Sequence, residues 1–157
     1  MTFKDLNQHL QQFRSQSEMD GISKYCVGVL PIREGKVALV RRVPDDFLGG
    51  YWELAGGGVE NGEDLLQTLV RETQEELGIR ILSFGLILPS FDYQTAKGKR
   101  VRQFNITIEI GDQKIQLNPK EHDDIVWLPL ENLFHHAQEK SISLTNEIKS
   151  VLGFLAR

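Results

Sequence analysis

Residues 57 to 79 read GGVENGEDLLQTLVRETQEELGI, and the rest of the chain is interpreted outward from this stretch. It begins inside a glycine-dense turn, Gly56–Gly58, and continues into a segment with strong helical propensity. We expect Asn61 to be the N-cap of the helix, with Asp64 as a weak capping-box partner. Gly78 is expected to end the helix in the left-handed conformation.

At helical spacing this segment has two faces. The face expected to be buried carries Leu66, Leu69, Val70, Thr73 and Leu77. Glu72, Glu75 and Glu76 fall within an arc of about 100° away from it, which predicts a solvent-facing carboxylate cluster. Like charges this close repel one another, so the cluster favours bound cations, and hard oxygen ligands suit Mg²⁺ or Mn²⁺. Arg71, four residues before Glu75, is placed to offset this charge and to orient a carboxylate.

The spacing of the whole stretch is more specific than the glutamates alone. Five residues separate Gly57 from Glu63, seven more separate Glu63 from Arg71, and Glu72, Glu75, Glu76 and Gly78 follow. A chance match to these seven positions is on the order of one in a million. The chain therefore resembles the Nudix hydrolase family, whose box it matches throughout except that Thr73 stands where an aliphatic residue is usual.

The resemblance implies an α+β fold, the Nudix α/β/α sandwich with a mixed sheet between helical layers, over about residues 24–155. It also implies Mg²⁺-dependent hydrolysis of a nucleoside diphosphate linked to a group X, with Mn²⁺ as a substitute. The favoured substrate is a nucleoside triphosphate, an oxidised one included, cleaved to monophosphate and pyrophosphate by water attack at phosphorus. The alternatives are a sugar nucleotide of the GDP-mannose type, ADP-ribose, a dinucleoside polyphosphate, or a non-catalytic nucleotide sensor.

The same resemblance suggests roles for individual residues. It implies that the metal ligands are Gly56 through its carbonyl, Glu72, Glu75 and Glu76, and that Glu63 and Arg71 hold these ligands in position. The catalytic set is Glu72, Glu75, Glu121 and His122. The general base remains open between Glu121, His122 and a glutamate of the box.

Basic residues outside the box are candidates for substrate binding. Arg41 and Arg42 are consecutive in a strand expected over residues 36–43, so one points to each side of the sheet. In the family a basic residue at this strand end often meets the substrate's phosphates; the alternative is a solvated strand end. A hairpin over 81–93 and 101–110 has a basic tip, which is either solvated or a clamp on phosphate or ribose: Lys97, Lys99, Arg100 and then Arg102. Three aromatic residues of the hairpin either stack on a base or pack in the core: Phe91, Tyr93 and Phe104.

The remaining pattern predicts one domain over residues 24–157, preceded by a helical extension, residues 1–23, packed on it. Within the extension Phe3, Leu6, Leu10 and Phe13 have near-helical spacing. Further strands are expected over 24–32, 51–54, 112–118 and 125–128, and helices over 129–139 and 143–155.

Composition narrows the class of protein. The chain has 157 residues and a net charge of −4, which argues against nucleic-acid binding through a generally basic surface. Its lone cysteine, Cys26, excludes an internal disulfide and is expected to be a buried strand residue. The chain carries neither a leader-like start nor a long apolar run. We therefore expect a cytoplasmic monomer or homodimer that acts on a small nucleotide, away from membranes.

Overall fold

The computed structural model describes all residues 1–157, and its sheet is assembled around strand β1 (Lys24–Arg33). β1 runs parallel to β6 (Arg100–Glu109) and antiparallel to β2 (Lys36–Arg42) and β4 (Ala55–Gly58). Its seven residues from Tyr25 to Pro31 are buried. A continuous apolar run of this kind is expected of a strand that is covered on both faces.

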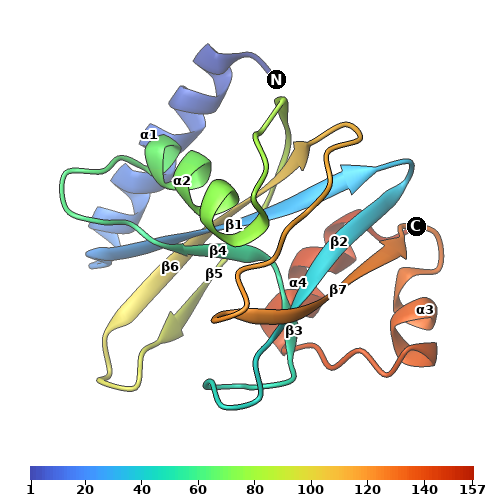
Figure 1. Ribbon diagram of the computed structural model, residues 1–157. Helices are drawn as coiled ribbons and strands as arrows, with labels where there is room; N and C mark the ends of the chain where they lie inside the picture. Colours follow the sequence, from blue (N-terminus) through green and yellow to red (C-terminus); the bar gives the residue numbers. More distant parts are fainter.

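The complete sheet is mixed and has seven strands. Its order is β3 (Trp52–Glu53), β2, β1, β6 and β5 (Ser83–Gln94), while β7 (His122–Pro129) pairs with β2 and β4 pairs with β1. Figure 1 shows helices on both sides of this sheet. Helices α1 (Phe3–Met19) and α2 (Leu65–Leu77) share one apolar core with the sheet, and α3 (Leu133–Glu139) and α4 (Asn146–Leu155) share the other. The expected α/β/α sandwich is confirmed.

Helix α1 lies against the sheet through its middle. Leu6 and Leu10 are buried, and the Phe13 ring meets the Phe104 ring edge-on at a centroid distance of 5.3 Å. Phe3 is exposed, contrary to the expected stripe, because it lies at the first turn of the helix beyond the sheet. None of the helices has both the length and the apolar character that a membrane crossing needs.

Helix α2 begins later than the sequence suggested. Its N-cap is Asp64, whose carboxylate accepts a hydrogen bond from the Gln67 backbone at 2.7 Å, while the Gln67 side chain accepts one from the Asp64 backbone at 2.8 Å. Asn61 lies in the preceding turn, so its assignment as N-cap is wrong. The helix ends at Gly78 in the left-handed conformation, with φ of 65°, as expected.

The buried face of α2 is also rotated from the expected stripe. Leu69, Thr73 and Leu77 are buried, but Val70 is 54% exposed. Leu66 is only partly buried. The helix instead turns Glu72 and Glu76 inward. Thr73 stands where the family usually has an aliphatic residue. Its buried hydroxyl is satisfied because it donates a hydrogen bond to the Leu69 carbonyl at 2.7 Å.

The strand expected over residues 112–118 is absent. This segment crosses the end of α2 instead: the Gln116 backbone N–H donates to the Leu77 carbonyl at 2.8 Å, and the Gln113 side chain donates to the Arg80 carbonyl at 2.8 Å. The alternation of apolar and polar residues predicted a strand here, but the hydrogen bonds of this segment are formed outside the sheet. The other expected elements are present with shifted ends.

Candidate active site

Strand β4 places the backbone of the glycine turn directly against α2. Gly56 pairs with Gly28 of β1, and Gly57 pairs with Val27. A Cβ at Gly56 would overlap the Val27 carbonyl, and a Cβ at Gly57 would overlap the Glu72 carboxylate. Glycine is required at position 56 because backbone atoms of β1 lie there, whereas a side chain at position 57 would displace the Glu72 carboxylate.

The three box carboxylates differ in their surroundings. Glu72 and Glu76 are only 7% and 6% exposed, so the expectation that they face solvent is wrong. Only the Glu75 side chain points outward, at 53% exposure. Burial raises the pKa of the Glu72 carboxyl, and the adjacent Arg71 guanidinium opposes that effect only in part.

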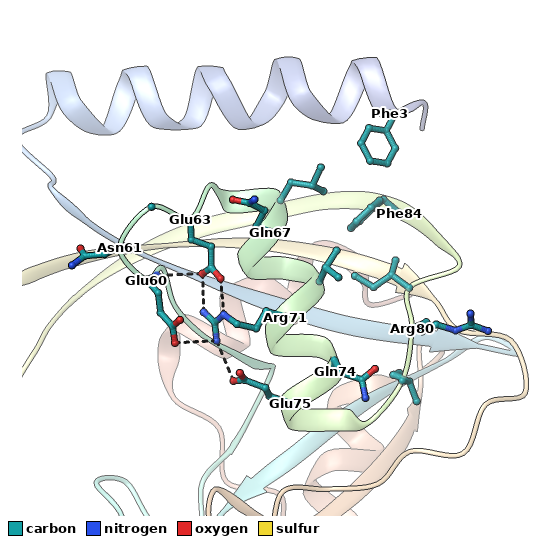
Figure 2. Close-up of a pocket in the computed structure, with 15 residues that line it drawn as sticks. Phe3, Glu60, Asn61, Glu63, Gln67, Arg71, Gln74, Glu75, Arg80 and Phe84 are labelled. Atoms are coloured by element: carbon teal, nitrogen blue, oxygen red, sulfur yellow. Dashed lines mark hydrogen bonds and ion pairs between the residues drawn. The ribbon is translucent and has the colours of Figure 1, made fainter.

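Arg71 joins the glutamates of the box. Its Nε and Nη2 donate to the two carboxylate oxygens of Glu63 at 2.6 and 2.8 Å. Nη1 donates to Glu72 at 2.8 Å and to Glu75 at 3.1 Å, and Nη2 also donates to the Gly58 carbonyl at 2.9 Å. Figure 2 shows the guanidinium between Glu60, Glu63 and Glu75. The Arg71 hydrogen bonds lower the pKa of Glu63 to about 2, so this pair stays ionised.

His122 and Glu53 form a second polar cluster beside Glu76. The His122 ring is 4% exposed, and its Nε2 lies 2.9 Å from Glu53 Oε2 in hydrogen-bond geometry. Its Nδ1 lies 2.8 Å from Glu76 Oε2, at ion-pair distance. Burial by itself would lower the pKa of His122, but the two carboxylates outweigh it and raise this pKa to about 9.

Glu53 was not found from the sequence. Its second oxygen accepts a hydrogen bond from Arg42 at 3.0 Å, so Glu53 connects His122 to the end of β2. The available signal was a charged residue between Trp52 and Leu54, both of which are buried. In an extended strand that alternation turns the middle side chain to the other face.

Arg41 and Arg42 do point in opposite directions. The Arg41 Nε donates to Asp123 at 2.7 Å, and its guanidinium lies over the Trp52 ring, 5.5 Å from the centroid. Arg42 instead donates to Asp46 at 2.9 Å as well as to Glu53, and lines the cleft described next. Of the two arginines, only Arg42 reaches this cleft.

A cleft on the sheet joins the polar cluster to a set of aromatic rings. One hollow, of about 310 Å³, is lined by Gly56, Gly57, Glu121 and His122 among others. The adjoining hollow, of about 360 Å³, carries four aromatic side chains beside Trp52: Phe47, Tyr51, Phe91 and Tyr93. The two hollows share a wall formed by Arg42, Glu53, Leu54, Tyr93, Thr95 and Gln103. We call these two adjoining hollows the cleft, with a polar end and an aromatic end.

Two candidates for substrate binding lie away from the cleft. Phe104 is buried in the core against Phe13, and this packing leaves no face of its ring for a base. Arg102 is held by Asp20 and Asp92, each at 2.7 Å. Their expected contacts with substrate therefore do not hold in this structure. Arg102 and Phe104 flank Gln103 in β6, so their side chains lie on the opposite face of the strand from Gln103, which lines the cleft.

Another hollow, of about 1110 Å³, lies on the outer face of α2 and is separate from the cleft. Figure 2 shows it between the start of α1 and the start of β5, with Phe3 and Phe84 on its apolar side and Glu60, Glu63 and Glu75 on the other. It is lined by Glu63, Arg71 and Glu75 but not by the glycine turn or His122, whereas Glu72 and Glu76 line neither this hollow nor the cleft. Its size alone therefore does not mark it as the place of catalysis.

The donor atoms near the glycine turn fit a hard divalent cation. Carboxylate and backbone carbonyl oxygens are the ligands that such ions prefer, and the buried Glu76 Oε2 is paired only with His122 Nδ1. As the side chains stand, no three His, Cys, Asp or Glu groups converge closely enough to hold an ion. Glu72 and Glu75 each direct one oxygen to Arg71, which leaves the second oxygen of each carboxylate for ligation.

Comparison with known families decides the class of this protein. The model described as the NUDIX domain matches residues 23–146, which include the glycine turn, α2 and His122. The chain belongs to the Nudix family. Nudix hydrolases generally use divalent metal ions, and this Nudix protein is a pyrophosphohydrolase of that family.

Individual relatives agree with this membership. The Nudix chain is 30% identical over 125 residues to nucleoside triphosphatase NudI of Escherichia coli (strain SE11), covering 73% of this chain and 88% of the relative. It is 36% identical over 95 residues to CTP pyrophosphohydrolase of Escherichia coli (strain K12), covering 60% and 67% respectively. Among solved structures, the MutT NUDIX hydrolase from Burkholderia pseudomallei aligns with a TM-score of 0.66 at 22% identity, covering 83% of this chain and 95% of that one. At 22% identity, the likeness to the Burkholderia structure shows the fold alone.

Proposed function

We propose that this Nudix enzyme hydrolyses a nucleoside triphosphate to the monophosphate and pyrophosphate by attack of water at phosphorus. The observation that carries the proposal is the cleft, in which an aromatic hollow adjoins a polar hollow lined by the glycine turn, Glu121 and His122. The names of NudI and CTP pyrophosphohydrolase support the same substrate class.

The aromatic end of the cleft suits a nucleobase. The Phe47 side chain is 75% exposed and Tyr51 is 37% exposed, so both rings are free to stack on a planar group. Arg42 stands in the wall common to both hollows, where the nucleoside would meet its phosphates. To donate charge-assisted hydrogen bonds to phosphate oxygens, this guanidinium would have to release Asp46 or Glu53, which it bonds at 2.9 and 3.0 Å.

The polar end would hold Mg²⁺, with Mn²⁺ as a substitute, through the Gly56 carbonyl and the carboxylates of Glu72, Glu75 and Glu76. When bound, the cation would neutralise phosphate charge and make water a better nucleophile. Arg71 and Glu63 would keep the box glutamates in position, since Arg71 bonds three of the surrounding carboxylates.

Geometry favours Glu121 over His122 as the general base. Both ring nitrogens of His122 face carboxylates, one of Glu53 and one of Glu76. Glu121 is exposed and lines the cleft, and its carboxylate forms no ion pair. Glu121→Gln is expected to lower kcat by about 10²- to 10³-fold, while Glu131→Gln, an exposed carboxylate outside the cleft, leaves it unchanged. A normal kcat in Glu121→Gln would return the role to a glutamate of the box.

We also propose that residues 24–157 act as one catalytic domain on which residues 1–23 pack. The protein would work in the cytoplasm as a monomer or homodimer. The single free thiol, Cys26, supports a reducing compartment, since it is buried and has no partner for a disulfide.

The decisive experiment is a hydrolysis screen with Mg²⁺ across nucleoside triphosphates, oxidised dGTP, ADP-ribose, sugar nucleotides and dinucleoside polyphosphates, with products separated by chromatography. Monophosphate plus pyrophosphate from a triphosphate supports the proposal. Turnover confined to a sugar nucleotide, ADP-ribose or a dinucleoside polyphosphate overturns the substrate assignment. Tight nucleotide binding without any turnover overturns catalysis and indicates a sensor.

A further inference from the structure

A fourth hollow, of about 520 Å³, lies where α1 ends and where β1 and β6 begin. It is lined by Gly21, Ser23, Lys24, Lys99 and Arg100, with no apolar side chain and no carboxylate among them. The three basic residues come together because Lys24 at the start of β1 pairs with Val101, next to the basic tip of the β5–β6 hairpin. We call these five residues the basic hollow.

The basic hollow adjoins the catalytic cleft through Lys24. This lysine lines both the basic hollow and the polar end of the cleft, where Gly57 and Gly58 are its fellow lining residues. It does not line the aromatic hollow. The polar end therefore has two neighbours: an aromatic hollow reached past Arg42, and a basic hollow reached past Lys24.

The cations of the basic hollow are poorly neutralised by the protein itself. Lys24 and Lys99 form no ion pair, and Arg100 has only long contacts, 3.5 Å to Asp92 and 3.5 Å to the Asp20 carbonyl. Arg102 nearby shows the contrast, since it bonds Asp20 and Asp92 at 2.7 Å each. The chain as a whole has a net charge of −4. Two lysines without ion pairs and a weakly paired arginine therefore form a local region of positive charge, which favours the binding of an anion.

We propose that the basic hollow is the subsite for the phosphates of the leaving group. This inference rests on the proposed function and deepens it, because it makes X a polyanion. A pyrophosphate or longer polyphosphate offers oxygens to the ammonium groups of Lys24 and Lys99, to the Arg100 guanidinium and to the Ser23 hydroxyl. The basic hollow has no carboxylate to accept hydrogen bonds from the hydroxyls of a neutral sugar. It also has no aromatic ring or apolar side chain against which the base of a second nucleoside could pack. Nucleoside triphosphates are thereby favoured over sugar nucleotides.

The test measures the binding of inorganic tripolyphosphate by calorimetry, in the presence of Mg²⁺, to the wild type and to Lys24→Ala and Lys99→Ala. Each substitution is expected to weaken binding about five- to tenfold, as for the loss of one exposed charge-assisted hydrogen bond, and less at high salt. The matched control is Lys36→Ala, because Lys36 is exposed at the end of β2 remote from Arg42. All three lysines are exposed, so thermal unfolding should confirm intact folding.

A wild type that fails to bind tripolyphosphate, or lysine variants that bind it as Lys36→Ala does, would overturn the subsite. Kinetics with a nucleoside triphosphate separate this failure from that of the proposed function. If the triphosphate is hydrolysed and the KM values of Lys24→Ala and Lys99→Ala remain at the wild-type value, only the subsite fails. If no triphosphate is hydrolysed but tripolyphosphate binding still depends on Lys24 and Lys99, the subsite stands and the proposed function fails. The supporting pattern is a raised KM with little change in kcat.

Discussion

At the residue scale, Arg71 has more partners than any other side chain of the candidate site. Its five N–H···O bonds reach Glu63, Glu72, Glu75 and the Gly58 carbonyl. The geometry depends on a planar guanidinium with donors on two edges, which an ammonium group cannot reproduce. The positive charge alone therefore does not account for this residue.

The corresponding prediction concerns Arg71→Lys. We expect kcat to fall about 10- to 100-fold because Glu72 and Glu75 lose their common donor. The free energy of unfolding should fall by about 1–2 kcal/mol, since the partly buried Glu63 and Glu72 keep fewer hydrogen bonds. Steady-state kinetics and urea unfolding provide the measurements, and Arg80→Lys, an exposed arginine just past α2, is the control. Wild-type kcat in Arg71→Lys would show that charge is sufficient.

A second residue-scale prediction concerns Glu76, which is buried and whose Oε2 lies 2.8 Å from His122 Nδ1. Glu76→Gln keeps the size of the side chain and removes its charge. We expect kcat to fall by about 10²-fold or more, together with weaker Mg²⁺ binding in calorimetry. Glu109→Gln, on the exposed end of β6, should change neither quantity. Unchanged Mg²⁺ affinity in Glu76→Gln would remove Glu76 from the ligand set.

At the scale of elements, α1 is held to the sheet by charge as well as by its apolar side. Arg102 of β6 bonds Asp20 at the end of α1 and Asp92 of β5. Hydrogen bonds from Arg102 hold the pKa values of both aspartates below their ordinary 3.8. A lowered pKa in the folded state stabilises the protein above the ordinary pKa, and that stability is lost as the pH falls through the folded-state pKa.

This contact predicts a difference in acid sensitivity. The wild type should lose more of its free energy of unfolding between about pH 5 and pH 2 than Arg102→Gln does, because the aspartates of the variant titrate nearly normally. Urea midpoints at several pH values measure the difference. If the two proteins lose equal stability in acid, the Arg102 contacts contribute nothing to the attachment of α1.

Most elements could be predicted from the sequence because their patterns are local. The strand run at Lys24–Ile32 and the glycine stop at Gly78 needed no knowledge of distant residues. The segment over 112–118 was mispredicted because its hydrogen bonds go to Leu77 and Arg80, which no local pattern reveals. Asn61 and Asp64 are both good capping residues, and only the Gln67 contacts decide between them.

The sequence predicted which residues belong to the candidate site better than it predicted how their side chains are buried and paired. Spacing identified Arg71 and the box glutamates, and their grouping around the glycine turn follows from the pairing of β4 with β1. The burial of Glu72 and Glu76 was missed, since it depends on where β4 and His122 lie. Glu53 was missed for the same reason: its partners, Arg42 and His122, are distant in sequence.

At the scale of the whole molecule, the cleft separates two kinds of recognition. The aromatic hollow lies on one side of the polar end, and the basic hollow adjoins that end through Lys24. A ligand that spans them is recognised by stacking at one place and by charge at another. The two contributions should therefore respond independently to substitution.

Phe47→Ala tests this independence. Loss of one stacking surface should weaken the affinity for a nucleoside triphosphate about 5- to 50-fold, while the affinity for tripolyphosphate stays at the wild-type value. Calorimetry with both ligands provides the comparison, and Phe154→Ala, an exposed aromatic residue on α4, is the control. Equal losses for the two ligands would mean that Phe47 supports the cleft as a whole.

The parallel pairing of β1 with β6 also bears on how the chain reaches its native state. Lys24 can pair with Val101 only after the residues between them, which include β2 to β5, have been synthesised. Closing so long a loop is entropically slow, and contacts of high sequence separation lower folding rates. During synthesis the apolar run of β1 stays without this neighbour until residues 100–109 leave the ribosome. Until then one edge of β1 lacks its strand partner, and unpaired strand edges favour aggregation.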